Sequence, residues 1–167
     1  MELHHKNHHN TYVTNYNNAV EQLQEAQHKG DISTQIALKP AINFNGGGHL
    51  NHSLFWENLA PKSAGGGEPP SGSLAKAIDS IYGSLGEFQN KMNTALAGIQ
   101  GSGWAWLVKD KQTGQISIRA YAVSLYCHTS IFCFYRNVQL LTSGQNQDPV
   151  VGQFEPILGI DAWEHAY

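Results

Sequence analysis

The sequence predicts an α+β protein, in which a helical first part precedes a small antiparallel sheet. Up to about residue 100, apolar residues recur at steps of three and four, the spacing of helices that bury one face. After "GIQGSG" the pattern changes, because "WAWLV" and "QISIRAYA" are rich in aromatic and β-branched residues and the polar turn "KDKQTG" separates them. Helices first and a sheet second is the order typical of α+β domains.

The first helix is predicted from Leu3 to about His28, where the apolar residues share one face and Gly30 follows as a C-terminal stop. Asp31 has the chemistry of an N-cap for a second helical run. That run extends through "STQIALKPAINFNGGGHLNHSLFWENL", and we expect it to be interrupted at Pro40.

The second half begins after "APKSAGGGEPPSGS", whose composition is that of a surface loop. Helical spacing returns over residues 74–85 and 88–99, the hairpin follows, and a third strand is predicted from Phe154 to Asp161. We therefore expect a helical hairpin domain over 1–60, a linker over 61–72, and an α/β domain with a three-stranded antiparallel sheet over 73–167.

Composition excludes several classes of function. The chain is 41% hydrophobic and 14% charged, as in globular proteins, and its net charge of -3 disfavours a nucleic-acid partner. No apolar run is long enough to span a bilayer, so no membrane partner is expected. The opening "MELHHKNHH" lacks the features of a signal or transit peptide, and two cysteines make no disulfide framework. The residues alone do not indicate a compartment.

Nine histidines are an enrichment for 167 residues, and four of the nine lie within the first nine positions. A helix would place His4, His8 and Tyr12 on one stripe and His5 and His9 on the next. The cluster suits a metal site, a solvated polar helix face or a tag remnant, although its interrupted pattern argues against a tag.

Further metal donors come from two other motifs. "GGGHLNHSLFW" contains His49 and His52, which alone could be a polar patch, and "GIDAWEHAY" contains Asp161 and His165. Imidazoles with one carboxylate and no thiolate suit manganese, iron or zinc. The four tryptophans could wall a small pocket or belong to the core: Trp56, Trp104, Trp106 and Trp163.

Five motifs follow one another along the chain: "LHHKNHHNTYV", "FNGGGHLNHSLFW", "GSGWAWL", "NQDP" and "GIDAWEHAY". In these motifs and their order the chain resembles the iron/manganese superoxide dismutases, and specifically the manganese type. The resemblance implies an enzyme that disproportionates superoxide to oxygen and hydrogen peroxide at a bound metal ion. It also implies a homodimer or homotetramer. The compartment expected from the family is the mitochondrial matrix, with the cytoplasm as an alternative.

The resemblance also implies roles for residues at the matching positions. The implied metal ligands are His4, His52, Asp161 and His165. The implied catalytic residues around them are His8 and Tyr12 at the mouth of the substrate channel, Trp56, Trp104 and Trp163 as a hydrophobic cage, Glu164 reaching a ligand histidine of the partner subunit, and Gln147 bonding the solvent on the metal. Iron-type members carry that glutamine where this chain has Gly48, so manganese is favoured and iron is the alternative.

The chain departs from the family pattern in three places. We expect it to be truncated at both ends, since the family has further residues before the first motif and after the last. Residues 123–145 form an insert between "AYA" and "NQDP" that contains Cys127 and Cys133, for which a disulfide is possible. Our hypothesis is that the insert is a retained intron, since its composition differs from that of the flanking sequence, and a natural loop is the alternative.

Two other functions compete with the enzyme. One is an inactive, truncated or intron-retaining isoform that acts, if at all, as an antigen or an interaction chain. The other is a zinc hydrolase, which we rank last because the sequence has no HExxH helix to supply a general base.

Overall fold

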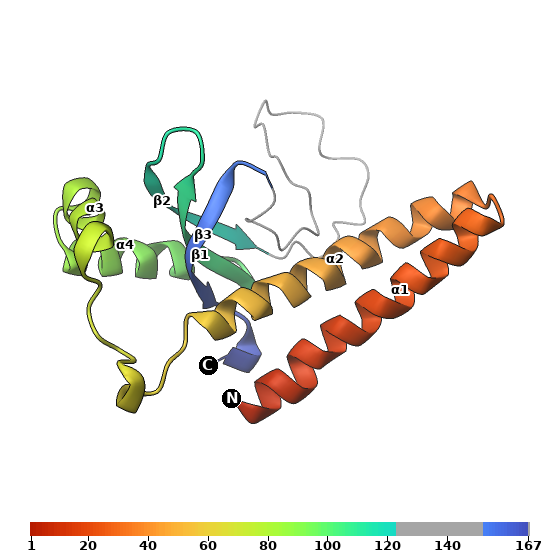
Figure 1. Cartoon of the computed structure of the whole chain (residues 1–167), viewed down its shortest axis with the longest axis horizontal. Helices are drawn as coiled ribbons and strands as arrows, with labels where there is room; N and C mark the ends of the chain where they lie inside the picture. The colour runs from red at the N-terminus through yellow and green to blue at the C-terminus, as the bar shows by residue number, and fades with distance from the viewer. Residues whose placement is uncertain (123–151, 167) are drawn as a thin grey trace.

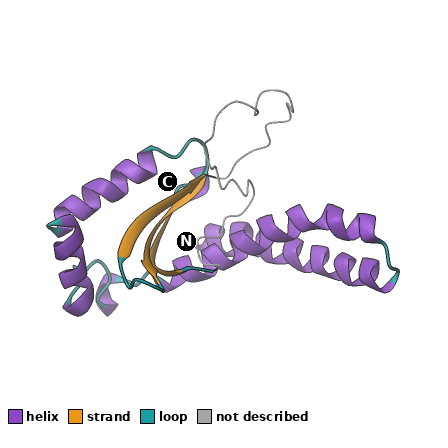
Figure 2. Ribbon diagram, turned by 90° about the horizontal axis from the view of Figure 1, so that it is seen from above, coloured by secondary structure: helices purple, strands orange, loops and turns teal. Residues whose placement is uncertain are grey.

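The computed structural model describes residues 1–122 and 152–166. A long helical hairpin lies beside a small sheet, and two further helices cover the other side of that sheet (Figures 1 and 2). The described elements are η1 (His4–His9), α1 (Asn10–His28), α2 (Ile32–Glu57), η2 (Lys62–Ala64), α3 (Gly72–Tyr82), α4 (Leu85–Ala97), β1 (Gly103–Asp110), β2 (Ile116–Ala122), β3 (Phe154–Asp161) and η3 (Glu164–Ala166). The predicted α+β class is confirmed.

The hairpin turns where the sequence predicts. Gly30 has a φ of 67°, a conformation that costs glycine little, and it ends α1. The Asp31 carboxylate then accepts a hydrogen bond of 3.0 Å from the backbone N–H of Thr34, which caps α2. The two helices consequently lie antiparallel and side by side along their length (Figure 1).

The predicted interruption at Pro40 is wrong. Helix α2 runs without a break from Ile32 to Glu57 with Pro40 inside it. Packing along α1 holds the helix together although proline contributes no N–H to its hydrogen-bond ladder. Continuity matters for the site, because it places the histidines near the end of α2 in a fixed relation to the whole hairpin.

The chain enters α1 through a π-helical turn, η1, over His4–His9. The sequence predicted ordinary helical stripes here, and the wider turn changes how the side chains fan out. Its buried members are His4 and His9, whereas His5 is exposed. Turns of this kind are frequent at functional sites in proteins.

The sheet has the order β2-β1-β3, and both pairs are antiparallel, as predicted. Strand β1 pairs Trp104 with Tyr121 on one side and with Asp161 on the other. An irregularity between Leu107 and Val108 lets Pro156 lie in the edge strand β3, where its missing N–H does little harm. The register places Asp161, the last residue of β3, directly beside Trp104.

Strand β1 is buried on both faces, and the two faces have different roles. Ala105 and Leu107 belong to a core with α3 and α4, whose members include Ile78, Phe88 and Met92. Trp104, Trp106 and Val108 belong to a second cluster, with Leu54, Phe55 and Trp163 among its neighbours. Figure 2 shows the sheet between these two helical layers. The alternation of side chains along one strand therefore separates a purely apolar core from the face that meets the hairpin.

Neither the predicted insert over 123–145 nor Cys127 and Cys133 fall within the described residues. The domain boundaries at 60 and 73 stay predictions. Among the helices of residues 1–122 and 152–166, none is long and apolar enough to cross a membrane.

Candidate metal centre

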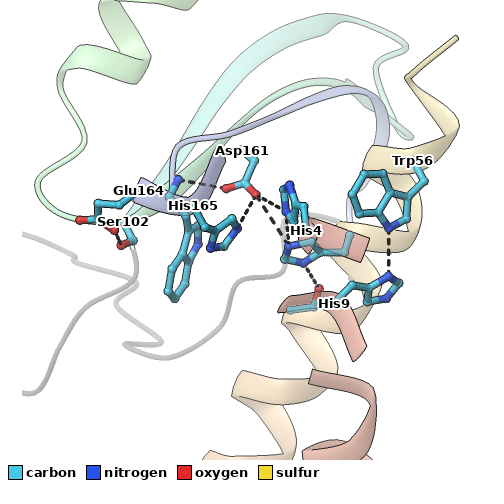
Figure 3. A network of polar contacts seen from close by, with 10 residues as sticks. His4, His9, Trp56, Ser102, Asp161, Glu164 and His165 are labelled. Atoms are coloured by element: carbon cyan, nitrogen blue, oxygen red, sulfur yellow. Dashed lines mark hydrogen bonds and ion pairs between the residues drawn. The ribbon is translucent and has the colours of Figure 1, made fainter. Parts of the chain in front are cut away.

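Four side chains from four elements of the chain converge between the hairpin and the sheet. His4 comes from η1, His52 from α2, Asp161 from the end of β3 and His165 from η3. One donor atom from each lies within 4.8 Å of the others, and this is the one such cluster that the described residues contain. Figure 3 shows His4, Asp161 and His165 pointing toward one another. The four residues that the sequence proposed as metal ligands are thus brought together.

The carboxylate of Asp161 lies at the middle of the cluster. Its Oδ2 is 3.1 Å from Nε2 of His165, 3.2 Å from Nε2 of His4 and 3.7 Å from Nε2 of His52. Its other oxygen, Oδ1, accepts a hydrogen bond of 3.0 Å from the backbone N–H of Trp163. The corner from strand β3 into η3 therefore holds one carboxylate oxygen and leaves the second facing three imidazoles.

His52 is fully buried and is oriented by its own helix. Its Nδ1 lies 2.7 Å from the carbonyl oxygen of Gly48, one turn earlier in α2. A carbonyl can only accept, so Nδ1 carries the proton and the neutral ring presents a bare lone pair at Nε2. That Nε2 lies 3.0 Å from Nε2 of His4. The chain thus fixes the tautomer that a metal ligand requires.

Burial shifts the charges of the cluster toward neutrality. Desolvation lowers the pKa of His52 to about 3, and desolvation together with His165 and His8 lowers the pKa of His4 to about 4. Burial also raises the pKa of Asp161, against the lowering effect of its bond from Trp163. At neutral pH the imidazoles of His4 and His52 are therefore free bases, the form that binds a metal.

The donor set fits a transition-metal ion. Bonds of about 2.1 Å from one ion to nitrogen and oxygen ligands place neighbouring ligand atoms about 3–4 Å apart. Four of the six distances among these donor atoms are 3.0 to 3.7 Å, which matches that spacing, and all four atoms lie within 4.8 Å of one another. Imidazoles with a single carboxylate suit manganese, iron or zinc, and they do not suit the oxygen-only shell of calcium.

Aromatic rings border the cluster on the sides that the sequence indicated. The Trp104 ring meets His52 edge-on at 5.1 Å, the Trp56 ring meets His4 edge-on at 5.0 Å, and the Trp163 ring stacks on His165 at 5.6 Å, all between ring centroids. Trp104 is completely buried. Each of these three rings therefore lies against a proposed ligand, and their role as a cage stays a prediction.

His8 and Tyr12 also reach the cluster. The His8 ring stacks on His165 with 4.4 Å between centroids and an angle of 13°. Tyr12 is buried beside His52 with a centroid separation of 5.2 Å, and its ring lies against Gly48, where an added Cβ would be 2.6 Å from Cδ1 of the tyrosine. Gly48 therefore provides the room that the Tyr12 ring occupies.

Two predicted residues are not placed in the cluster. Glu164 is exposed and accepts a hydrogen bond of 2.9 Å from the hydroxyl of Ser102 (Figure 3). This bond contributes to the lowered pKa of Glu164, after the backbone hydrogen bond at Glu164 itself. Gln147 lies outside the described residues. Their proposed roles, toward a partner subunit and toward solvent, stay predictions.

Sequence reasoning noted His9 and His49 without giving either a role. In the structure the indole N–H of Trp56 donates to Nδ1 of His9 at 2.9 Å, and Nε2 of His9 lies 2.8 Å from Nδ1 of His49. Sequence reasoning missed Asn58 entirely, whose Oδ1 accepts from the backbone N–H of Gly159 at 2.7 Å and joins the end of α2 to β3. Histidines four residues apart were visible in the sequence, but their partners 40 and 47 residues away were not.

Comparison with known proteins finds similar chains that cover the whole length of this one. Residues 1–60 match the family described as iron/manganese superoxide dismutases, alpha-hairpin domain, and residues 70–134 and 127–167 match the C-terminal domain of that family. Mitochondrial manganese superoxide dismutase 1 of Arabidopsis thaliana is 49% identical over 170 residues, covering 100% of this chain. The mitochondrial manganese superoxide dismutase of Schizosaccharomyces pombe is 51% identical over 168 residues, again covering 100% of this chain. The chain spans 64% of the first relative's length and 65% of the second's.

Proposed function

This chain belongs to the iron/manganese superoxide dismutase family, and we propose that it holds manganese and disproportionates superoxide to oxygen and hydrogen peroxide. The proposal of this activity rests on the family of the chain and on relatives that are named manganese superoxide dismutases. The inactive isoform considered above is not favoured by these comparisons.

One observation supports the proposal most directly. The structure brings His4, His52, Asp161 and His165 within 4.8 Å of one another although the chain separates them by up to 161 positions (165 minus 4). Because Nδ1 of His52 donates to the carbonyl oxygen of Gly48, the lone pair on Nε2 of His52 faces the other three donor atoms. A buried cluster of neutral imidazoles around one carboxylate has no advantage for stability, so a bound cation explains it better than packing does.

Manganese held by His4, His52, Asp161 and His165 would supply the one-electron redox chemistry that superoxide disproportionation requires. The chain contributes a single negative charge, from Asp161, to a site whose other proposed ligands are imidazoles. With a metal ion bound, the site would therefore carry a net positive charge that attracts a small anion. The indoles of Trp56, Trp104 and Trp163 limit what reaches it by size.

Proton supply is the second task of the chain, since two superoxide ions take up two protons to give one oxygen and one hydrogen peroxide. Tyr12 and His8 are proposed to deliver them, because each lies against a ligand ring, Tyr12 against His52 and His8 against His165. Gln147 is proposed to bond the solvent at the site, so Gln147→Glu or Gln147→Ala should remove most of the activity and leave the metal bound.

Manganese is proposed ahead of iron. The position from which iron-type members are expected to extend a glutamine is Gly48, and a side chain there meets the ring of Tyr12. Relatives named as manganese enzymes support the same choice. Elemental analysis of the purified protein, produced with both metals supplied, distinguishes the two.

Compartment and assembly are also proposals. The relatives carry mitochondrial in their names, which supports the mitochondrial matrix. A homodimer or homotetramer is proposed, with Glu164 contacting a ligand histidine of the partner subunit, and this is consistent with its exposed position in η3. Sedimentation of the purified chain, with Glu164→Ala as the variant, measures the assembly.

The proposal is tested by measuring manganese content and superoxide consumption on one preparation of the full chain. We expect about one manganese ion per chain and an activity that disappears in Asp161→Asn, since that variant loses the carboxylate at the middle of the donor set. Asp79→Asn, which changes an exposed carboxylate in α3, is the matched control and should keep both. A folded chain that holds no manganese and consumes no superoxide would contradict the proposal.

A further inference from the structure

A second set of polar side chains lies beside the metal centre and includes none of the proposed ligands. It consists of Trp56, His9 and His49, which we call the indole–imidazole chain. The Trp56 indole N–H donates to Nδ1 of His9 at 2.9 Å, and Nε2 of His9 lies 2.8 Å from Nδ1 of His49. Figure 3 shows the bond between Trp56 and His9 on the side of His4 away from His165.

The donors and acceptors within the indole–imidazole chain follow from the indole N–H of Trp56. An indole N–H can only donate, so Nδ1 of His9 must offer a lone pair. His9 therefore carries its proton on Nε2 and donates it to Nδ1 of His49. The hydroxyl of Ser53 lies 3.4 Å from the same His49 nitrogen. The two bonds of His9 thus have one consistent direction.

The position of His9 connects the indole–imidazole chain to two of the proposed metal ligands, His52 and His4. His9 ends the π-helical turn that begins at His4, and its ring stacks on His52 at 5.4 Å between centroids with an angle of 19°. The Trp56 ring, held by His9, meets His4 edge-on at 5.0 Å and 73°. Its partners Trp56 and His49 both belong to α2, so His9 joins η1 to two turns of the neighbouring helix.

We propose that His9 is a positioning residue of the metal centre, which holds Trp56 against His4 through the indole hydrogen bond and thereby slows loss of the metal. The proposal rests on the proposed manganese site. It assigns the effect to one of the two polar bonds of His9, because only the bond to Trp56 ends at a ring that touches a ligand outside α2.

The two bonds of His9 can be separated by a matched pair of substitutions. In His9→Asn the amide oxygen takes the place of Nδ1 and can still accept from Trp56, but nothing reaches His49. In His9→Gln the amide takes the place of Nε2 and can still reach His49, but the indole N–H loses its acceptor. The variants differ by one methylene group and have opposite effects on the two bonds.

The first measurement is the rate at which excess EDTA removes manganese from the loaded full-length chain. We expect roughly a five- to tenfold faster loss from His9→Gln than from wild type, the effect of one lost hydrogen bond to a partly buried donor, and a rate within about twofold of wild type for His9→Asn. Equal rates for the two variants, or a faster loss from His9→Asn, would overturn the proposal.

The second measurement needs no metal. In a ¹H–¹⁵N spectrum of the metal-free chain, the Trp56 indole resonance is identified by its absence from Trp56→Phe. It should keep its position in His9→Asn and move toward the position of a water-exposed indole in His9→Gln. An unchanged resonance in His9→Gln would show that Trp56 is held by something else.

The outcomes separate this inference from the proposed function. A wild-type chain that binds no manganese contradicts the metal site, while the indole resonance still reports on His9. Where His9→Gln does not fold, Trp56→Phe tests the bond from the other side, since it deletes the N–H and keeps an aromatic ring. It should then release manganese faster than wild type, and His9→Asn should add no further acceleration to it. A further acceleration would sink the proposal.

Discussion

At the scale of single residues, the centre depends on backbone groups that fix how its side chains act. The Gly48 carbonyl sets the tautomer of His52, and the Trp163 N–H occupies one oxygen of Asp161. Neither partner is a proposed ligand, yet each decides which atom the ligand offers. Burial lowers the pKa of His4 and of His52, so the lone pairs of both rings stay available at neutral pH.

The metal-free chain should lose stability in mild acid. The imidazole of His52 titrates near 6.5 when unfolded and at about 3 when folded, so between these values the unfolded chain binds the extra proton. The stability that neutral His52 contributes is fully present above about pH 6.5 and is lost as the pH falls. At pH 5 the loss amounts to about 2 kcal/mol. His4 acts in the same direction, whereas the raised pKa of Asp161 acts in the opposite one.

Urea unfolding of the metal-free chain at about pH 7.5 and pH 5 measures this effect. His52→Gln should lose less stability between the two pH values than wild type, and His28→Gln, a change on the exposed end of α1, should lose as much as wild type. An acid loss in His52→Gln equal to that of wild type would exclude His52 as its source.

Gly48→Ala should destabilise the folded chain by about 1–3 kcal/mol, because the new methyl group would lie 2.6 Å from the buried ring of Tyr12. Gly46→Ala is the matched control in the same helix. Its methyl group would approach Cε2 of Tyr16 at 3.0 Å, and that ring is less buried and can move. Urea midpoints of the two variants should therefore differ, and equal midpoints would mean that Tyr12 adjusts freely.

At the scale of elements, α2 carries more of the site than its local sequence suggests. It supplies His52, the Gly48 carbonyl and Trp56, and its end is joined to β3 through Asn58. A proline and three consecutive glycines would weaken an isolated helix of this composition. Contact with α1 along the whole hairpin offsets that weakness.

Pro40→Ala should raise the thermal unfolding midpoint. Proline inside a helix removes one hydrogen bond and costs up to about 3 kcal/mol, and α2 continues on both sides of Pro40. We expect a gain of about 1–2 kcal/mol, since the native helix has already adapted in part. Lys39→Ala, at the exposed neighbouring position, should leave the midpoint nearly unchanged. A lower midpoint in Pro40→Ala would indicate that the proline has a structural role.

The elements were largely predictable and the contacts between them were not. The spacing of apolar residues and the caps at Gly30 and Asp31 predicted the helical hairpin, and strand-like sequence patterns predicted all three strands. The Pro40 interruption was wrong because local propensity competes with tertiary packing, which a single sequence does not display. The π-helical turn was likewise invisible, since its apolar pattern does not differ from that of an α-helix over so few residues.

At the scale of the whole molecule, the ligand cluster is where the hairpin and the sheet meet. His4 and His52 belong to one side, and Asp161 and His165 to the other. The residues were identified from motifs that resemble a family, and their convergence required the structure. The partners of His9 show the limit of sequence reading, because no local pattern relates a histidine to a tryptophan 47 residues away.

Manganese should stabilise the whole molecule, since an ion held by both halves binds only the folded chain. At a free concentration about 100-fold above its dissociation constant it would add about 2.7 kcal/mol, or roughly 5–10 °C in the unfolding midpoint of a chain of this size. EDTA should remove the gain, and magnesium should not produce it because imidazoles suit that ion poorly. A midpoint indifferent to manganese in wild type, or a full gain in Asp161→Asn, would contradict the bridging role.

The separation of the ligands along the chain has a consequence for biosynthesis. A ribosome makes His52 well before Asp161, which follows 109 residues later (161 minus 52), so a nascent chain offers the imidazoles of His4 and His52 long before the carboxylate of Asp161 can join them. Two imidazoles on a growing polypeptide hold manganese weakly and prefer copper, nickel or zinc. Correct loading therefore has to wait until Asp161 and His165 have been made, and a cell that supplies the wrong metal early would have to remove it again.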